Sequence, residues 1–234
     1  MTNTEGPSRL AGAYAPGLPG LPRGRSSLPG DVVRKEQRER LTRGVIAAVA
    51  EKGYARTTVA DVVGRARVSR KVFYEHFADL PACFLAATAG AIQPVATSLY
   101  EAARRHRVAR EADGRPRDHV EALRSGVRTY LELCAREPEF TRCLVIELPA
   151  AGPEALRLDG ENLRQFAGLL RVWHERAVVD HPGWAPVTDD ICFAAIGAVA
   201  ALVRVRVVAD DTAGLPALED TVLDVLLRLL AAPR

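Results

Sequence analysis

The sequence predicts an all-α protein with two helical domains. Apolar residues recur at helical spacing along most of the chain, and no stretch alternates apolar and polar residues as a half-buried strand does. Aromatic residues make up only 6% of the 234 residues, which disfavours an all-β fold. A hydrophobic content of 48% permits a sizeable core, and the length suits two domains. We therefore expect an N-terminal three-helix domain with a helix-turn-helix, followed by a C-terminal helical domain.

Residues 1–30 are predicted to form a disordered N-terminal arm, because they contain six Gly and five Pro and lack an apolar period. The arm carries Arg9, Arg23 and Arg25. A passive tail is the favoured interpretation of this segment, and the alternative is that its arginines enter a DNA minor groove.

A cytoplasmic location without a membrane partner is also expected. The N-terminus has no apolar signal core. The longest uncharged apolar stretch, from Ile191 to Val203, has 13 residues, whereas a membrane span needs about 17–25. The four cysteines are widely spaced and form no CxxC pair, which indicates reduced core residues rather than disulfides or a zinc site.

The first ordered domain is predicted at residues 31–78. Asp31 is expected to cap a helix of residues 32–52, and Gly53 suits the end of that helix. The positions that form its buried stripe are Leu41, Val45, Ala48 and Val49.

Two short helices joined by a tight turn then form the helix-turn-helix. The first, about 59–65, follows Thr58, which with Asp61 resembles a capping box. Ser69 is expected to cap the second, about 70–77, with Phe73 and Phe77 facing inward.

Residues 79–234 are predicted to form the C-terminal domain. Asp79 is expected to cap a helix of about 79–92, and Pro94 to interrupt it before the pattern resumes to about Arg107. Further helices are expected at about 118–136, 138–147, 153–177, 188–209 and 216–231.

The charge is unevenly distributed along the chain. Residues 31–85 contain 11 basic and 7 acidic residues, a net charge of +4, although the whole chain carries only +3. A basic module on a mildly acidic body suggests that the module meets a polyanion, with chance clustering of solvated charges as the alternative.

The exposed face of the second short helix has the chemistry of a DNA-reading helix. In a major groove, Arg70 and Lys71 can donate to guanine, and Val72 can contact a thymine methyl group. An ordinary surface helix is the alternative for this segment taken alone.

A longer run of residues is more specific. It comprises Thr-Thr-Val-Ala-Asp-Val-Val at 57–63, Val-Ser-Arg at 68–70 and Phe-Tyr-Glu-His-Phe at 73–77. Together with Glu-Lys-Gly-Tyr at 51–54 and Cys-Phe-Leu-Ala-Ala at 83–87, this run resembles the DNA-binding segment of the TetR family of bacterial transcription regulators. The resemblance covers about residues 34–90. It implies a helical dimer whose C-terminal domain binds a small-molecule effector.

The resemblance also implies a role for individual residues. The implied base contacts are Arg70, Lys71, Val72 and Tyr74, and the implied phosphate contacts are Thr58, Ser69 and His76. Two positions depart from the family pattern: Arg67 stands where the turn usually has Gly, and Leu80 stands where the fourth helix usually begins with Lys. A non-glycine residue at positive φ costs about 1–2 kcal/mol.

A homodimer through about residues 188–231 is expected. The stretch 191–203 is apolar around the whole helix, and the last helix carries leucine or valine on several sides. Both helices must therefore be buried against other apolar surfaces. Burial within a single subunit is the alternative.

The effector is expected among the helices of residues 95–180, and its binding residues are left unassigned. Candidate linings are Tyr100, Tyr130, Phe140, Phe166, Trp173 and His174, although at helical spacing such residues are more often plain core than ligand contacts. The apolar helix surface suits a hydrophobic or amphipathic small molecule.

No enzyme, metal or cofactor is expected. The five histidines show no HExxH spacing, and no glycine-rich phosphate loop is present. Glu101, Glu132, Glu137 and Glu147 are expected to be solvated charges. We therefore predict a sequence-specific, DNA-binding transcription regulator, a repressor released from its operator by a small molecule. The alternative is a small-molecule-binding or scaffold protein with impaired DNA binding.

Overall fold

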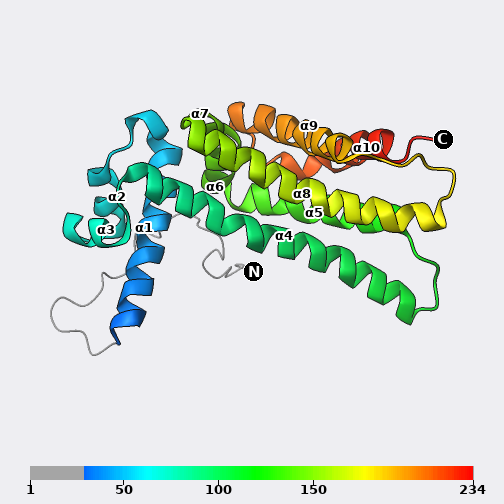
Figure 1. The fold of residues 1–234 in the computed structure, drawn as a ribbon, viewed down its shortest axis with the longest axis horizontal. Coiled ribbons are helices and arrows are strands. Elements are labelled where there is room, and N and C mark those ends of the chain that lie inside the picture. Colours follow the sequence, from blue (N-terminus) through cyan, green and yellow to red (C-terminus); the bar gives the residue numbers. More distant parts are fainter. Residues whose placement is uncertain (1–28, 234) are drawn as a thin grey trace. The chain divides into compact units, whose positions relative to one another are not determined.

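The protein is described by a computed structural model that covers residues 29–233 (Figure 1). In this part of the chain no strand forms, and one isolated bridge pairs Trp184 with Pro233. The predicted all-α class is therefore confirmed. Positions 1–28 of the predicted arm, including Arg9, Arg23 and Arg25, lie outside the described residues. The first helix begins at Gly30.

The chain divides into two compact units. The first contains the residues up to Ala91 together with Glu139–Leu156, and the second contains Ile92–Pro138 and Arg157–Arg234. This division differs from the predicted domains of residues 31–78 and 79–234, because the start of the fourth helix and segment 139–156 pack with the first helices. The elements of the first unit are α1 (Gly30–Lys52), η1 (Tyr54–Arg56), α2 (Val59–Ala66), α3 (Arg70–His76), the start of α4 (Leu80–Ala112), most of α6 (Pro138–Arg142), the π-helical turn η2 (Cys143–Glu147), α7 (Leu148–Ala150) and the start of α8 (Pro153–Asp180).

Helix α1 contacts α2, α3, η1 and η2 of the first unit. Its predicted stripe is confirmed, because Leu41, Val45, Ala48 and Val49 are fully buried. The predicted cap at Asp31 is wrong: Pro29 is the N-cap residue, it makes no side-chain cap bond, and Asp31 lies in the first turn. An acidic side chain there still interacts favourably with the helix dipole.

Gly44 sets the close approach of α1 and α2. A Cβ atom at this position would lie 3.1 Å from the carbonyl oxygen of Val62 and 3.4 Å from the Cβ atom of Ala66. Only glycine therefore lets the two helices meet at this distance without a shift of the neighbouring backbone.

Helix α4 runs unbroken for 33 residues, so the interruption predicted at Pro94 is wrong. Proline removes one backbone hydrogen bond and costs about 3 kcal/mol in a helix interior. The residues on both sides of Pro94 offset this cost by burial: Ala91, Ile92, Val95 and Ala96 are each at most 6% exposed. Tertiary packing thus overrides the local signal.

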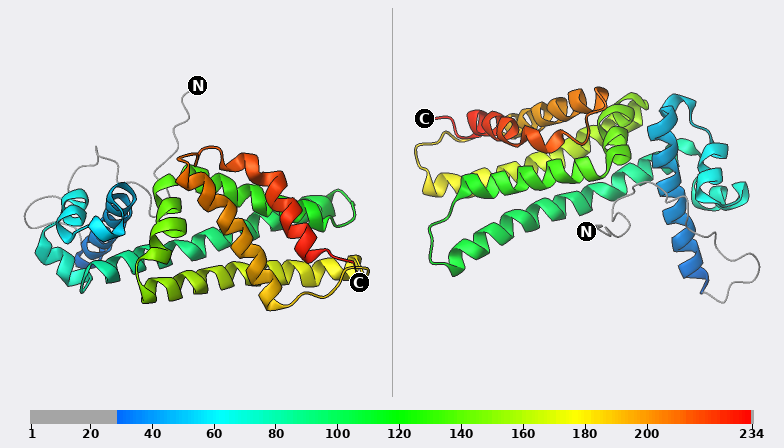
Figure 2. Two further views of the ribbon diagram at one scale, coloured as in Figure 1. Left: turned by 90° about the horizontal axis from the view of Figure 1, so that it is seen from above. Right: turned by 180° about the vertical axis from the view of Figure 1, so that it is seen from behind.

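The second unit packs its helices around apolar stripes. Its further elements are α5 (His119–Arg136), α9 (Asp189–Val208), η3 (Leu215–Leu218) and α10 (Glu219–Leu230). Leu123, Val127 and Leu131 of α5 are buried. Helix α10 contacts both α5 and α9 (Figure 2). Glu219 at its start joins Arg124 and Arg128 of α5 in ion pairs of 3.1 and 2.8 Å.

Helices α9 and α10 bury their apolar residues differently. In α10, Val222, Leu223, Leu226 and Leu230 are buried inside the subunit, so for these residues the alternative of burial within a single subunit is confirmed. Helix α9 instead leaves a stripe in which every member is exposed or half-buried: Ile191, Ala194, Ala198, Ala201, Val205 and Val208. By length and composition alone, α4 and α9 pass as membrane spans, a test that core helices of soluble proteins also pass.

Candidate nucleic-acid interface

The candidate reading helix, α3, is held by a capped start and two buried rings. The Ser69 hydroxyl accepts a hydrogen bond from the Val72 amide (3.2 Å), so Ser69 is the N-cap residue, as predicted. Phe73 is fully buried and Phe77 is 5% exposed, with their ring centroids 5.9 Å apart. These anchors fix which face of α3 points outward.

Helix α2 begins with the predicted capping box. The Asp61 amide donates to the Thr58 hydroxyl oxygen, while the Asp61 carboxylate accepts from the Thr58 amide (2.9 Å) and hydroxyl (2.7 Å). Lys52, at the end of α1, also bonds this carboxylate. The Lys52 bond, and then the Thr58 bonds, lower the pKa of Asp61 to about 2. The Thr58 hydroxyl, a predicted phosphate donor, is thus already engaged in the free protein.

The turn between α2 and α3 contains the predicted left-handed residue. Arg67 has φ 52° and ψ 44°, and its amide donates to the Val63 carbonyl. The preference of this position for glycine therefore follows from its backbone geometry. Arg67 is exposed and takes part in a further interaction within the protein.

The outer face of α3 presents most of the predicted base-contacting residues to solvent. Arg70 and Lys71 are exposed in the first turn, and Tyr74 is 58% exposed with its ring edge-on to Phe73 at 5.3 Å. Val72 is half-buried, so only part of its side chain is accessible. Arg70 and Lys71 lie in the first turn, the part that reaches base edges in helix-turn-helix proteins, and Tyr74 lies one turn further along the helix.

His76 closes the helix and is tied to α1. Its Nε2 atom lies 3.3 Å from the Gln37 side-chain oxygen, and its carbonyl accepts from Arg38 (3.4 Å). Burial, and then the nearby charges of Arg34 and Arg38, lower the pKa of His76. The imidazole of His76 is therefore neutral at neutral pH in the free protein.

The start of α4 has the predicted cap. The Asp79 side chain accepts from the Ala82 amide (2.8 Å). Leu80, the first helical residue, is half-buried, and its side chain cannot donate a hydrogen bond to phosphate.

The candidate effector-lining residues are divided between the two units. Tyr100 is 46% exposed, whereas Phe140 is buried in the first unit. Tyr130 and Phe166 of the second unit pair at 6.4 Å.

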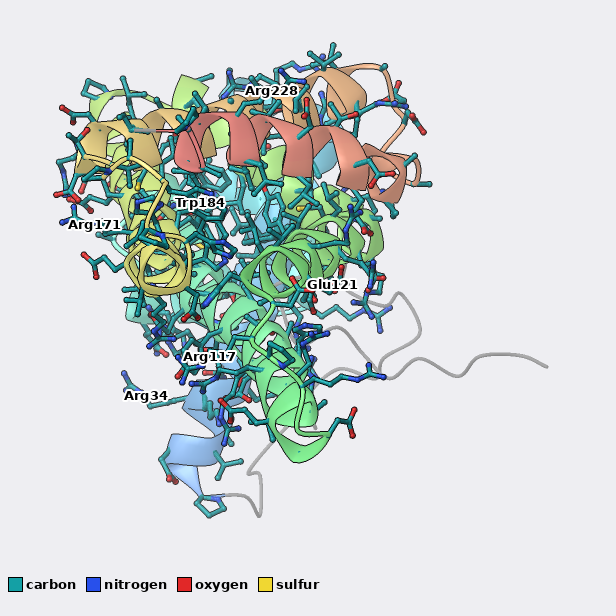
Figure 3. All side chains as sticks on the ribbon, turned by 90° about the vertical axis from the view of Figure 1, so that its right-hand side faces the viewer. Arg34, Arg117, Glu121, Arg171, Trp184 and Arg228 are labelled. Atoms are coloured by element: carbon teal, nitrogen blue, oxygen red, sulfur yellow. The ribbon has the colours of Figure 1, made fainter. Side chains whose placement is uncertain are left out.

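Trp173 and His174 belong to an aromatic cluster around Trp184, which is labelled in Figure 3. In this cluster, His181 stacks on Trp184 with centroids 4.5 Å apart, and the Trp173 indole donates to the His119 carbonyl (2.8 Å).

Glu147 is buried, although the sequence predicts a solvated charge. It is only 9% exposed, and its Oε2 atom accepts a hydrogen bond from the Tyr54 amide (2.8 Å), at the turn between α1 and α2. The expectation of a solvated charge is therefore wrong. Local pattern carries no signal for this contact, because 93 residues separate the two partners.

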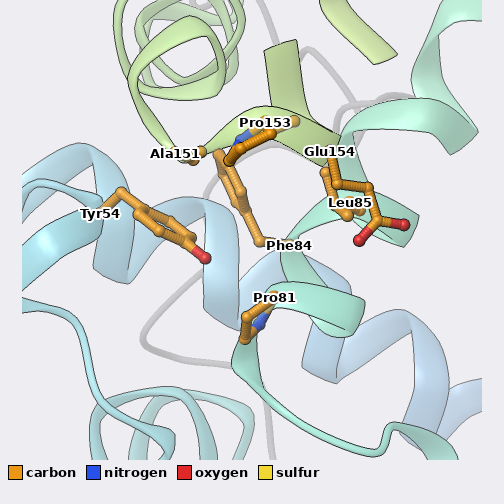
Figure 4. Close-up of a pocket in the computed structure, with 9 residues that line it drawn as sticks. Tyr54, Pro81, Phe84, Leu85, Ala151, Pro153 and Glu154 are labelled. Carbon is orange, nitrogen blue, oxygen red and sulfur yellow. The ribbon is translucent and has the colours of Figure 1, made fainter. Parts of the chain in front are cut away.

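A small hollow lies in the same unit (Figure 4). Its volume is about 120 Å³. Tyr54, Pro81, Phe84, Pro153 and Glu154 contribute to its lining. The rings of Tyr54 and Phe84 are 5.1 Å apart.

Comparison with known proteins identifies the reading segment and the fold. The pattern of the bacterial regulatory proteins of the tetR family matches residues 46–87. No curated protein matches the sequence.

Solved structures resemble the chain over most of its length. The fatty acid degradation regulator FadR from Bacillus halodurans has a TM-score of 0.69 and 17% identity, over 82% of this chain and 94% of that protein. FadR from Bacillus subtilis, in complex with stearoyl-CoA, has a TM-score of 0.68 and 16% identity, over 80% and 96%. A TetR-family regulator from Syntrophomonas wolfei has a TM-score of 0.66 and 14% identity, over 85% and 96%. At these identities the likeness establishes the fold.

Proposed function

We propose that this chain, which belongs through residues 46–87 to the tetR family of bacterial regulatory proteins, is a repressor that a small molecule releases from operator DNA. As a family member it is a transcription regulator. The repressor role, the effector and the individual contacts are the finer points of the proposal.

The exposed first turn of α3 carries the proposal. Arg70 and Lys71 extend from a helix whose start is capped by Ser69 and whose inner face is anchored by Phe73 and Phe77. Two donors on a rigid support can form bidentate bonds with guanine, each of which discriminates against the wrong base by about 1–3 kcal/mol. Tyr74 is accessible to a base or to the adjoining phosphate.

A homodimer through α9 is part of the proposal. The exposed members of the α9 stripe recur at alternating intervals of three and four residues, which is the spacing of a helix–helix seam. Gly197 has no neighbour within 4 Å of an added Cβ atom, which leaves room for a second helix. A dimer would present two copies of α3 to successive major grooves, about 34–36 Å apart.

The effector would bind in the second unit and change the spacing of the two reading helices. The stearoyl-CoA bound by FadR from Bacillus subtilis makes a long-chain acyl-CoA the first compound to test. It also matches the hydrophobic or amphipathic class expected from the apolar helix surface. We expect the protein to act in the cytoplasm, without a cofactor and without a membrane partner.

Selection of DNA fragments by the purified protein, followed by sequencing, tests the proposal. We expect a near-palindromic site and an affinity that falls as salt rises, because phosphate neutralisation releases counterions. Stearoyl-CoA is then added to the complex with the selected DNA, and octanoyl-CoA serves as a short-chain comparison. Release by the long chain alone would support the proposed effector class, and release by neither would reject it.

The alternative is a helical binding or scaffold protein with impaired DNA binding. The half-buried Leu80, in place of a phosphate-contacting lysine, favours it. Recovery of random fragments, with no enriched site, would establish this alternative.

A further inference from the structure

The turn between α1 and α2 has one backbone amide that only a distant side chain satisfies. Gly53 has φ 81° and ψ 151°, which ends the helical hydrogen-bond pattern of α1 after the Gly53 amide has donated to Val49. The next amide, that of Tyr54, donates instead to the Glu147 carboxylate at 2.8 Å. The rest of the turn closes on itself, since Thr57 donates its amide to the Tyr54 carbonyl and its hydroxyl to the Gly53 carbonyl.

Glu147 is held in place from its own side. It ends the π-helical turn η2, and π-helical turns often occur at functional sites. Arg142 lies 3.7 Å from its second carboxylate oxygen. The Cys143 thiol donates to the Ile46 carbonyl (3.5 Å), and Leu148 is fully buried, so both ends of η2 are fixed within the first unit.

The position of Tyr54 bears on the reading helix. Tyr54 begins η1, and only Thr57 and Thr58 separate η1 from the start of α2. Helix α2 in turn leads into α3 through the tight turn at Arg67. A shift of the Tyr54 backbone would therefore alter the point from which both helices of the helix-turn-helix begin.

We propose that Glu147 is a positioning residue for DNA reading, which fixes the start of the helix-turn-helix through the Tyr54 amide. This inference rests on the proposed function. Segment 139–156, which contains Glu147, is joined at both ends to chain of the second unit.

Two conservative variants distinguish the effect of side-chain length from the effect of charge. Glu147→Gln keeps the length and one acceptor oxygen but removes the charge, whereas Glu147→Asp keeps the charge but is shorter by one methylene group. If the bond to Tyr54 matters, the Asp variant loses it and the Gln variant keeps it. Glu154→Asp is the matched control, because Glu154 is exposed and belongs to the same unit.

Three measurements are made on the full chain: hydrogen exchange of the Tyr54 amide, affinity for the selected DNA and for random DNA, and the thermal midpoint. We expect Glu147→Asp to speed the exchange and to weaken selected-site binding about tenfold, the effect of one lost hydrogen bond to a charged group. Binding to random DNA and its salt slope should not change, because no phosphate contact is lost. Glu147→Gln and Glu154→Asp should resemble the wild type.

The opposite pattern, weak binding by the Gln variant and normal binding by the Asp variant, would overturn the positioning role in favour of a charge effect. Equal losses on selected and random DNA, in step with a lower midpoint, would reduce Glu147 to a residue of general stability and overturn the proposal. If the Asp variant does not fold, the Gln variant decides. Weak selected-site binding by a stable Gln variant would refute the proposal. Normal binding by the Gln variant, with a protected Tyr54 amide, would support it. A wild-type protein that selects no site would instead refute the proposed function, and with it the role of Glu147.

Discussion

The exposed stripe of α9 makes a quantitative prediction about the dimer. Val205 is 68% exposed and Val208 is 66% exposed in the single subunit. Full burial of a valine side chain contributes about 1.5–3 kcal/mol, so covering the exposed two thirds of Val205 is worth about 1–2 kcal/mol per subunit. A two-fold dimer covers the side chain twice, which gives about 2–4 kcal/mol. The variant Val205→Asp should therefore raise the dimer dissociation constant at least about 30-fold.

The assay is sedimentation over a range of concentrations, with thermal melts alongside. Val179→Asp is the matched control, since Val179 is 73% exposed but lies on α8, outside the stripe. Leu226→Asp is an unsuitable probe, because Leu226 is 3% exposed and a buried charge would destabilise the subunit itself. An unchanged dissociation constant for Val205→Asp, or an equal effect of Val179→Asp, would refute the assignment of α9 to the interface.

Four further predictions concern the reading module. Arg70→Ala should cost about 1–3 kcal/mol at the selected site and relax one base preference, whereas His76→Ala should weaken all sequences alike; footprints that show equal losses for both would deny Arg70 a base contact. Leu80→Lys should steepen the slope of log affinity against log salt by about 0.9, which a salt titration measures. Arg67→Gly should raise the thermal midpoint if its positive φ is only a strain, and should flatten the salt slope if its side chain meets phosphate. Asp61 has a lowered pKa, so its stabilisation is complete above about pH 4 and is lost as pH falls toward about 2; melts of wild type and Asp61→Asn should converge there.

The helix-turn-helix could be predicted from sequence because its signals are local. The caps at Thr58, Ser69 and Asp79 each satisfy an amide three residues further along the chain. The positive φ of Arg67 likewise follows from a tight turn between two short helices. Such interactions depend on neighbours in sequence, so a residue pattern is sufficient to locate them.

The remaining features depend on tertiary packing, which the sequence pattern does not contain. Pro94 is a helix breaker by its own chemistry, and only the burial of its neighbours keeps α4 continuous. Apolarity alone did not indicate that Leu226 faces the subunit core while Val205 faces solvent. Glu147 is predicted to be a surface charge, because its neighbours in sequence carry no sign of the hydrogen bond that it accepts from the Tyr54 amide.

Residues 31–85 carry a net charge of +4. The structure shows which of their basic side chains are already paired with carboxylates. Arg40, Arg43, Lys52 and Arg65 are paired with carboxylates of the same module, so they contribute little to an external field. Within residues 29–233, no carboxylate lies within ion-pair distance of Arg70, Lys71 or Arg38. Arg38 also donates to the carbonyl of His76, which places it at the C-terminal end of α3. Part of the positive charge without a carboxylate partner therefore lies at the two ends of α3.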